Sequence, residues 1–253
     1  MTAQPDQTAR NPVILIPARL ASTRLPNKPL AEIAGEPMIV HVWRRAREAD
    51  LGPVYVACAD RAIAEVIEAV GGNAVMTDAD LPSGSDRIFA ALQKVDPEGS
   101  FDAVINIQGD SPTLDKTMPR IAIAALDDPA VDIATIACPI TDDAERGDPN
   151  VVKAVVSAAP GAASGRALYF TRAEAPGGEG PLYHHEGLYV YRRAALERFV
   201  ALPQSPLEIR ERLEQLRALE DGMHIEVVFV DSLPLGVNTP AELELARAAL
   251  GIT

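Results

Sequence analysis

Three cations behind the first apolar run of the chain form the clearest candidate for a binding site. The run covers residues 13–16, and the loop that follows it carries Arg19, Arg24 and Lys28. No acidic residue occurs from position 11 to position 31, although the formal net charge of the chain is −13. Guanidinium and ammonium groups together suit a polyphosphate, because a guanidinium binds two oxygens at once and an ammonium is a mobile point charge. The alternative is three solvated surface cations, and the loop has neither a dinucleotide-binding glycine pattern nor a P-loop.

A second candidate follows another apolar run, residues 103–107. Gln108, Gly109 and Asp110 come directly after it. A carboxylate in this place suits Mg²⁺ bound to phosphates, since Mg²⁺ takes one or two carboxylates and completes its shell with phosphate oxygens and water. The glycine allows close approach to the backbone. The alternative is an aspartate that accepts hydrogen bonds from its own turn.

Both candidates need a sheet whose strands end at one edge. In the first half of the chain, short apolar runs alternate with amphipathic stretches. This alternation predicts an α/β protein with a doubly wound, mostly parallel, Rossmann-like sheet, which binds ligands beyond the carboxyl ends of its strands. The expected strands are 13–16, 54–57, 74–76 and 103–107, and the expected helices are 39–46, 63–70, 86–95 and 119–126.

The pattern changes after residue 127. Strands are expected at 133–140, 151–157, 188–191 and 226–230, helices at 194–200, 207–219 and 240–250, and loose stretches at 158–165 and 175–180. We therefore expect a single domain over residues 11–253, with a small β-rich lobe inserted at about 130–190. Residues 1–10 are expected to be a disordered tail.

Composition excludes several classes of protein. The acidic balance argues against nonspecific binding to nucleic acid or anionic membranes. No apolar run approaches the length of a membrane span, and the first ten residues lack the apolar region of a signal peptide. Cys58 and Cys138 each lie in an apolar run, as free thiols in a reducing compartment do. We expect a cytoplasmic protein without membrane insertion.

The cationic loop also carries a family resemblance. Residues 17–30 read PARLASTRLPNKPL. This stretch resembles the N-terminal signature P-A-R-x-x-S-x-R-L-P-x-K-P-L of the 3-deoxy-manno-octulosonate (Kdo) cytidylyltransferases, and every fixed position is matched. Further motifs follow in the family's order, so that the resemblance covers essentially residues 12–250. It implies a nucleotidyltransferase fold and the conversion of CTP and Kdo to CMP-Kdo and pyrophosphate, which activates the sugar for lipopolysaccharide synthesis. It also implies Mg²⁺ as cofactor and a homodimer, with contacts from the inserted lobe.

The resemblance implies a nucleotide site as well. Ser83 to Arg87 reads S-G-S-D-R and resembles the family's S-G-T-E-R, although Ser85 could simply cap the helix behind it. Of the implied residues, Arg19, Lys28 and Asp110 are expected to be catalytic. The full nucleotide-binding set is Pro17, Ala18, Arg19, Ser22, Arg24, Lys28, Ser83, Arg87, Gln108 and Asp110.

Three later motifs imply the sugar site. They read Y-F-T-R-A at 169–173, H-E-G-L-Y at 185–189 and L-E-Q-L-R at 213–217, within a segment that begins P-L-E at 206. Alternatives remain, because the paired histidines could be structural and Glu214 could pair with Arg210 or Arg217 along a helix. The implied sugar-binding residues are Arg172, His185, Tyr189, Glu214 and Gln215.

Three positions depart from the family's pattern. In G-V-N-T-P at 236–240, Asn238 stands where the family has an aspartate that binds the metal beside Asp110. We expect Asn238 to be a weaker, neutral metal ligand and also to cap the helix that starts at Pro240. Ser111 replaces an acidic residue that usually follows Q-G-D. Ala59 stands at the acidic position of an A-T-D motif, and the sequence leaves open whether Asp60 substitutes for it.

Two other functions stay open at this point. One is a cytidylyltransferase for an altered Kdo, such as 8-amino-Kdo, or for another acid sugar. The other is a nucleotide-binding protein that has lost activity through the change at Asn238.

Overall fold

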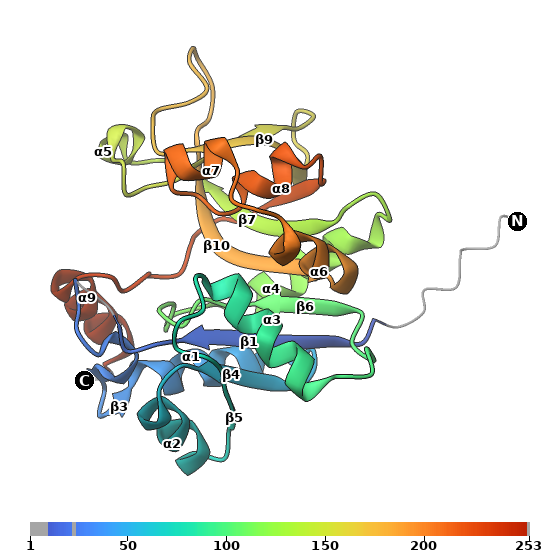
Figure 1. Cartoon of the computed structure of the whole chain (residues 1–253). Helices are drawn as coiled ribbons and strands as arrows, with labels where there is room; N and C mark the ends of the chain where they lie inside the picture. The colour runs from blue at the N-terminus through green and yellow to red at the C-terminus, as the bar shows by residue number, and fades with distance from the viewer. Residues whose placement is uncertain (1–9, 22–23, 252–253) are drawn as a thin grey trace, which may run out of the picture.

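Strand β1 (Pro12–Ala18), which leads into the cationic loop, lies inside a nine-stranded sheet in this computed structural model (Figure 1). The structure describes residues 10–21 and 24–251. The strand order is β5-β4-β1-β6-β10-β7-β11-β9-β8. The other strands of the sheet are β4 (Val54–Cys58), β5 (Asn73–Met76), β6 (Ala103–Asn106), β7 (Ile133–Pro139), β8 (Lys153–Ser157), β9 (Ser164–Thr171), β10 (Tyr183–Arg192) and β11 (Ile225–Phe229).

The N-terminal half of the sheet is parallel, as predicted. β1 pairs with β4 on one side and with β6 on the other, and β5 extends the sheet beyond β4. Val13 through Ile16 are fully buried because helices cover both faces, and this is why the strand is apolar at every position. The order of strands reverses between β1 and β6, which is where open α/β sheets bind ligands.

The other half of the sheet is mixed, so the predicted mostly parallel sheet is wrong there. β10 runs antiparallel to both β6 and β7, while β11 is parallel to β7. β9 pairs antiparallel with β11 and β8, and β8 also pairs antiparallel with the start of β10. The strands at 130–190 therefore continue the central sheet. β9 begins at Ser164, inside a stretch that we expected to be loose, and β10 is longer than predicted.

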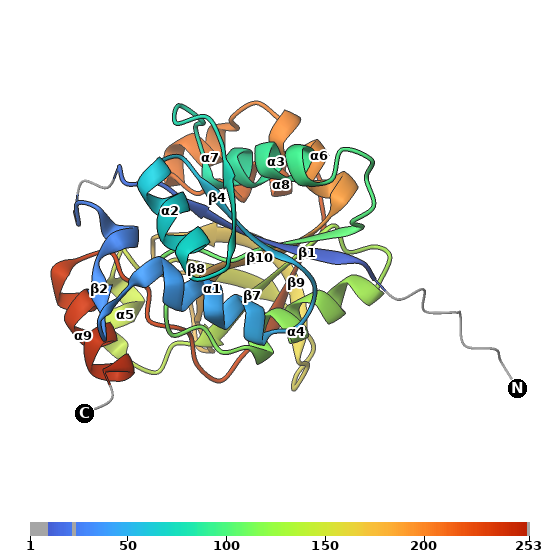
Figure 2. The ribbon, with the colours of Figure 1, turned by 90° about the horizontal axis from the view of Figure 1, so that it is seen from below.

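Helices cover the sheet on two sides, as Figure 2 shows for α3, α6 and α8 above it and for α1 and α4 below it. The lower group packs on Ile14 and Ile16, and the upper group packs on Val13 and Leu15. Successive side chains of β1 thus face opposite helix layers. A strand placed between two layers of helices is apolar at every position, as in other α/β proteins. The helices are α1 (Met38–Glu48), α2 (Arg61–Ala69) and α4 (Thr117–Ala124), and α3 (Gly84–Val95), α6 (Arg193–Ala201), α7 (Pro206–Glu211) and α8 (Leu216–Glu220).

The predicted helix at 207–219 is broken into α7 and α8. Arg212 adopts a left-handed conformation with φ +57°, and its N–H donates to Glu208 O at 2.7 Å. The break lets Glu208 and Arg217 form a buried ion pair, with 2.5 Å between Arg217 Nη2 and Glu208 Oε1. Glu208, rather than Glu214, is thus the partner of Arg217.

The C-terminal helix α9 (Pro240–Leu250) returns to the N-terminal half of the chain, beside the short hairpin β2 (Glu32–Ile33) and β3 (Glu36–Pro37) (Figure 1). An apolar cluster joins them, in which Ile33 packs with Val237 and Leu243. The hairpin, which was not predicted, brings Asn238 to the cationic loop. The remaining short elements are α5 (Asp143–Gly147), a 3₁₀ turn at Lys28–Leu30 and another at Ala125–Asp127.

Other expectations concern the ends of the chain and its thiols. The predicted tail, residues 1–10, lies outside the described residues except for Arg10, whose Nη2 lies 2.9 Å from Asp127 Oδ1. Cys58 is buried, Cys138 is half-buried, and both are free thiols as expected. Among the described helices, none has the length and apolar character needed to cross a membrane.

Candidate active site

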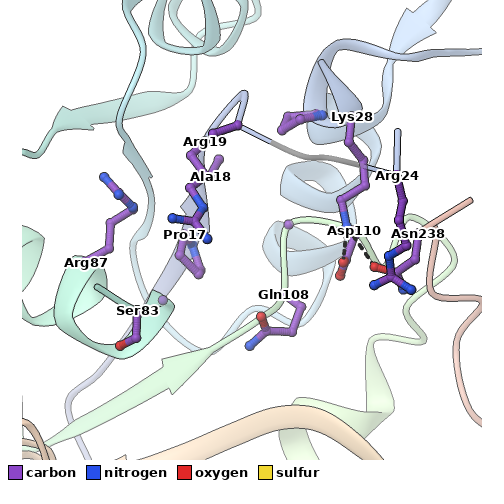
Figure 3. Close-up of a pocket in the computed structure, with 14 residues that line it drawn as sticks. Pro17, Ala18, Arg19, Arg24, Lys28, Ser83, Arg87, Gln108, Asp110 and Asn238 are labelled. Atoms are coloured by element: carbon purple, nitrogen blue, oxygen red, sulfur yellow. Dashed lines mark hydrogen bonds and ion pairs between the residues drawn. The ribbon is translucent and has the colours of Figure 1, made fainter. Parts of the chain in front are cut away.

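A cavity of about 450 Å³ opens at the carboxyl ends of β1 and β6, where the strand order reverses (Figure 3). Two strands that are distant in the sequence thus place their following loops side by side. Of the residues predicted for the nucleotide and the metal, the following line it: Pro17, Ala18, Arg19, Arg24, Lys28, Ser83, Arg87, Gln108, Asp110 and Asn238. Ser22 lies outside the described residues.

Gly109 explains how two of the loops come so close, and Gly84 lies at ordinary contact distance from the same strand end. A Cβ on Gly109 would lie 2.7 Å from the carbonyl oxygen of Pro17, which is closer than a side chain allows. A Cβ on Gly84, at the start of α3, would lie 3.4 Å from the Pro17 ring. Both contacts are made to the end of β1, so the Q-G-D and S-G-S-D-R motifs pack their backbones against one strand end.

Lys28, Asp110 and Asn238 form the electrostatic centre of the cavity, and Figure 3 draws their two bonds as dashed lines. Lys28 Nζ donates to Asp110 Oδ2 at 2.5 Å and to Asn238 Oδ1 at 3.0 Å. The Val237 N–H donates to the Asp110 carbonyl at 2.9 Å. Because Val237 is fully buried, it fixes the position of Asn238 beside Asp110.

Asn238 is not the cap of α9, so that prediction is wrong. The Thr239 hydroxyl accepts the N–H of Glu242, and the Glu242 carboxylate accepts the backbone N–H of Thr239. This reciprocal pair is a capping box, and it frees the Asn238 amide to face the cavity.

The oxygens of Asp110 and Asn238 could hold a divalent cation. They already converge on one positive group, the Lys28 ammonium. Over residues 10–21 and 24–251, no cluster of three or more histidine, cysteine or acidic side chains forms a metal site. A cation here would therefore depend on phosphate oxygens and water for its remaining ligands. That arrangement suits Mg²⁺, which keeps much of its shell outside the protein.

Arg87 lines the cavity, but its guanidinium is engaged with the protein. It donates to the Thr77 hydroxyl at 2.7 Å and to the carbonyls of Asp78 and Ala79 at 2.9 and 3.3 Å. Burial and then the nearby Arg19 lower the pKa of Arg87. The contacts indicate that Arg87 braces the loop at 77–79.

Helix α3 is capped by Ser83, not by Ser85 as the alternative interpretation had it. The Ser83 hydroxyl caps the helix by accepting the N–H of Asp86, and Ser83 also lines the cavity. Ser85 instead donates its hydroxyl to Glu214 Oε2 at 3.0 Å. The helix start thereby joins the nucleotide side to the segment predicted for the sugar.

Asp60 has a clear position, although the sequence left its role open. Its Oδ2 accepts the N–H of Leu20 at 2.8 Å, and the neighbouring Ala59 N–H donates to the Ala18 carbonyl at 3.0 Å. Asp60 thus anchors the backbone of the cationic loop.

Two of the predicted sugar residues lie together on β10. The rings of His185 and Tyr189 are 5.5 Å apart, and the Thr135 hydroxyl lies 2.9 Å from His185 Nε2. Burial, and to a lesser extent His184, lower the pKa of His185 to about 3, so the ring is neutral. A neutral imidazole offers hydrogen bonds rather than charge.

The other predicted sugar residues lie apart from the first cavity. Glu214 borders a neighbouring cavity of about 640 Å³ that shares Ser83 with the first. Burial raises the pKa of Glu214, and its Oε1 has no hydrogen-bond partner among the described residues. Gln215, next to it, is buried. Arg172 donates to the carbonyls of Glu211 and Pro149 at 3.1 and 2.9 Å.

Sequence reasoning missed Glu186, which lies between His185 and Gly187. Its Oε1 accepts a hydrogen bond from the Ser111 hydroxyl at 3.2 Å. Burial and then the Asp110 carboxylate raise the pKa of Glu186 to about 8. No local pattern points to this contact, because the sheet pairing alone brings positions 111 and 186 together.

Comparisons with known proteins agree on one activity. A family model described as "Cytidylyltransferase" matches residues 13–225. The chain is 63% identical over 250 residues to a 3-deoxy-manno-octulosonate cytidylyltransferase of Rhodospirillum centenum, covering 99% of this chain and 96% of that protein. It is 61% identical over 239 residues to the protein of the same name in Paramagnetospirillum magneticum, covering 94% and 97%.

Solved structures place the fold among cytidylyltransferases. A CMP:2-keto-3-deoxy-manno-octonic acid synthetase complexed with CTP superposes with a TM-score of 0.87 at 39% identity, covering 95% of this chain and 98% of that chain. A 4-diphosphocytidyl-2C-methyl-D-erythritol synthase from Anaerococcus prevotii gives a TM-score of 0.65 at 13% identity, over 96% and 100% of the two chains. The second likeness concerns the fold alone.

Proposed function

Because this chain belongs to the 3-deoxy-manno-octulosonate cytidylyltransferase family, we propose that its cavity converts CTP and Kdo to CMP-Kdo and pyrophosphate. The family membership and the CTP-dependent nucleotidyltransferase activity predicted from the sequence are thereby confirmed. The observation that carries the proposal is one cavity that joins the three loop cations with Asp110 at the reversal point of the sheet.

The loop cations suit the triphosphate of CTP. Arg19, Arg24 and Lys28 line the same cavity, and the loop between them contains no acid. Arginine forks match pairs of phosphate oxygens, while the Lys28 ammonium can follow the charge as it moves to the leaving pyrophosphate. We assign the catalytic role to Arg19, Lys28 and Asp110 on these grounds.

Asp110 and Asn238 would hold Mg²⁺, with phosphate oxygens and water as its other ligands. When bound, Mg²⁺ supplies charge neutralisation on the phosphates and polarises the α-phosphoryl group. Asn238 contributes a neutral oxygen, so the Asp110 carboxylate provides the negative charge of this pair. Lys28, which contacts both residues, moves its ammonium to the phosphates when the nucleotide is present.

The sugar acid would lie between the nucleotide and β10. Gln108 Nε2 donates to the Gly187 carbonyl at 2.8 Å, so the nucleotide wall and the β10 motif are in direct contact. His185 and Tyr189 from this motif, with Arg172, Glu214 and Gln215, are proposed to bind the carboxylate and hydroxyls of the sugar. The anomeric hydroxyl oxygen would bond to the α-phosphorus and give up its proton to solvent. The bond between the α-phosphorus and the oxygen that bridges it to the β-phosphorus would break, and pyrophosphate would leave with the electron pair. Catalysis would rest on positioning and charge neutralisation.

A homodimer belongs to the proposal as well. β9 lies in the region predicted for dimer contacts, and its Leu168 side chain is 58% exposed. Sedimentation of the purified protein tests this prediction directly.

Sugar identity is the finer part of the proposal, and competing substrates test it. Pyrophosphate release is measured with CTP and Mg²⁺, and the rates with Kdo, 8-amino-Kdo and another acid sugar are compared. We expect the highest kcat/KM with Kdo. A higher value with 8-amino-Kdo would assign the enzyme to the altered sugar, and CTP binding without release for any sugar would show a protein that has lost activity.

A further inference from the structure

Glu186 is a half-buried carboxyl group to which the reaction gives no role. It belongs to β10, and its Oε1 accepts the Ser111 hydroxyl at 3.2 Å. Ser111 is 2% exposed and directly follows Asp110. The hydrogen bond therefore joins the strand of the sugar motif to the loop of the proposed metal ligand. A carboxyl oxygen accepts this bond whether or not the group carries a proton.

β10 is irregular where Glu186 leaves it. Its register with β7 shifts between Glu186 and Tyr189. The Thr135 hydroxyl of β7 fills the irregularity, at 3.1 Å from the Glu186 carbonyl and 2.8 Å from the Leu188 carbonyl. Bulges redirect side chains and are frequent beside active sites. Here the bulge allows Glu186 to reach Ser111 on the neighbouring loop.

Gln108 connects the same two segments a second time, through the Gly187 carbonyl at 2.8 Å. Asp110 thus lies between two residues, Gln108 and Ser111, that are both bonded to the bulge of β10. We propose that Glu186 is a positioning residue, which acts through Ser111 to hold the Asp110 carboxylate in the orientation that the reaction needs. This role rests on the proposed function, because it is defined by that reaction.

The sequence pattern agrees with this geometry. Ser111 places a neutral hydroxyl donor directly after the Asp110 carboxylate. Glu186 places a carboxyl group against Ser111 from another strand. The hydrogen bond thereby pairs a donor on the Asp110 loop with an acceptor on β10.

Alanine variants test whether the two side chains act as one unit. Glu186→Ala and Ser111→Ala should each lower kcat roughly ten-fold, as expected for loss of a hydrogen bond to a carboxyl group. The KM for CTP should stay within about two-fold, because the phosphate contacts remain. The double variant should be no slower than either single one, since both remove the same bond. Glu65→Ala, which removes an exposed carboxylate on α2, is the matched control.

Conservative and exchanged variants separate positioning from general damage. Glu186→Gln should keep most of the activity, because its amide oxygen still accepts the Ser111 hydroxyl. Ser111→Asp alone should lose activity, since it sets two carboxyl groups together. Combining Ser111→Asp with Glu186→Gln should recover the activity, because the new glutamine amide then donates the hydrogen bond and the new aspartate carboxylate accepts it. Additive alanine losses, or a Glu186→Gln variant as slow as Glu186→Ala, would overturn the proposal.

Amide hydrogen exchange gives a readout that needs no turnover. In the substrate-free protein, Glu186→Ala should speed exchange in the loop at 108–111 and leave the hairpin at 32–37 unchanged. Unchanged exchange in the loop would refute the proposal that Glu186 holds this loop in position through Ser111. A wild-type protein that binds CTP but releases no pyrophosphate would instead refute the proposed function, so the two failures are distinguishable.

Discussion

Lys28 Nζ lies 2.5 Å from Asp110 Oδ2, although the two residues are 82 positions apart in the chain. The pair joins the cationic loop after β1 to the acidic loop after β6. Under the proposed function, phosphates that enter the cavity would compete for Lys28, and a divalent cation would compete for Asp110. Nucleotide binding and metal binding would then be coupled through this pair.

Replacing Lys28 with alanine should lower kcat/KM for CTP by about 10- to 100-fold, as expected for the loss of a charged hydrogen bond to phosphate. Steady-state kinetics with varied CTP measure the effect. Thermal stability should change by less than about 1 kcal/mol, because the pair is partly accessible to solvent. Lys116→Ala, an exposed lysine outside the cavity, is the control. Unchanged kcat/KM in a folded Lys28→Ala protein would remove Lys28 from the site.

Asp110→Asn should lower kcat by about 100- to 1,000-fold, the size typical of losing one group that stabilises transition-state charge. Asn238 is already neutral, so the substitution leaves no carboxylate between these two ligands. Calorimetric titration should still detect CTP binding, because the loop cations remain. Asp231→Asn, at an exposed position, serves as control. Near-normal turnover at millimolar Mg²⁺ would show that Asp110 serves the turn alone.

Asn238→Asp should reduce the Mg²⁺ concentration needed for half-maximal rate. A carboxylate gains a charge-assisted contact that the amide lacks, on the order of 1–3 kcal/mol, or roughly ten-fold or more in metal affinity. The difference should shrink at high Mg²⁺ as occupancy saturates. An Mg²⁺ titration at saturating CTP and Kdo measures it for both proteins. Superimposable curves would mean that residue 238 does not face the metal.

The helix cap gives that titration an internal comparison. Because Thr239 caps α9, Thr239→Ala should cost about 1 kcal/mol of stability. Thr239→Ala should leave the Mg²⁺ requirement unchanged. Asn238→Asp should lower the Mg²⁺ requirement and leave the stability unchanged. A Thr239→Ala protein as stable as wild type would contradict the capping role of Thr239.

His185 should make the protein sensitive to mild acid. Burial lowers its pKa to about 3 in the folded protein, so the unfolded chain takes up the proton first. The stability contribution is full above pH 6.5 and falls as the pH drops below that value, by on the order of 2 kcal/mol at pH 5. His185→Gln should therefore lose less stability between pH 7.5 and pH 5 than wild type. Urea unfolding at both pH values measures this, and equal losses would contradict a neutral buried ring.

The sequence predicted well those parts of the fold that local pattern determines. β1, β4 and β6 are apolar at most positions because helices cover them on both faces, and such runs can be recognised in the sequence without knowledge of their neighbours. The parallel half of the sheet and the cavity at its edge follow from that. The cationic loop and Asp110 were identified because both directly follow strands of this kind.

The sequence did not predict those features of the fold that depend on contacts between residues far apart in the chain. Arg212 breaks the expected helix at 207–219 without a glycine or proline to mark it, because the Glu208–Arg217 ion pair compensates. β9 and the first half of β10 are held by antiparallel neighbours rather than by their own apolar pattern. Asn238 was assigned the cap that belongs to Thr239, since either residue type suits that position.

The most direct test of the account is pyrophosphate release by the purified protein with CTP, Kdo and Mg²⁺, in which each component is omitted in turn. The account predicts stoichiometric release of pyrophosphate with formation of CMP-Kdo in the complete mixture, and only background release when CTP, Kdo or Mg²⁺ is left out. Release that persists without Kdo, or CTP binding with no release in the complete mixture, would contradict it.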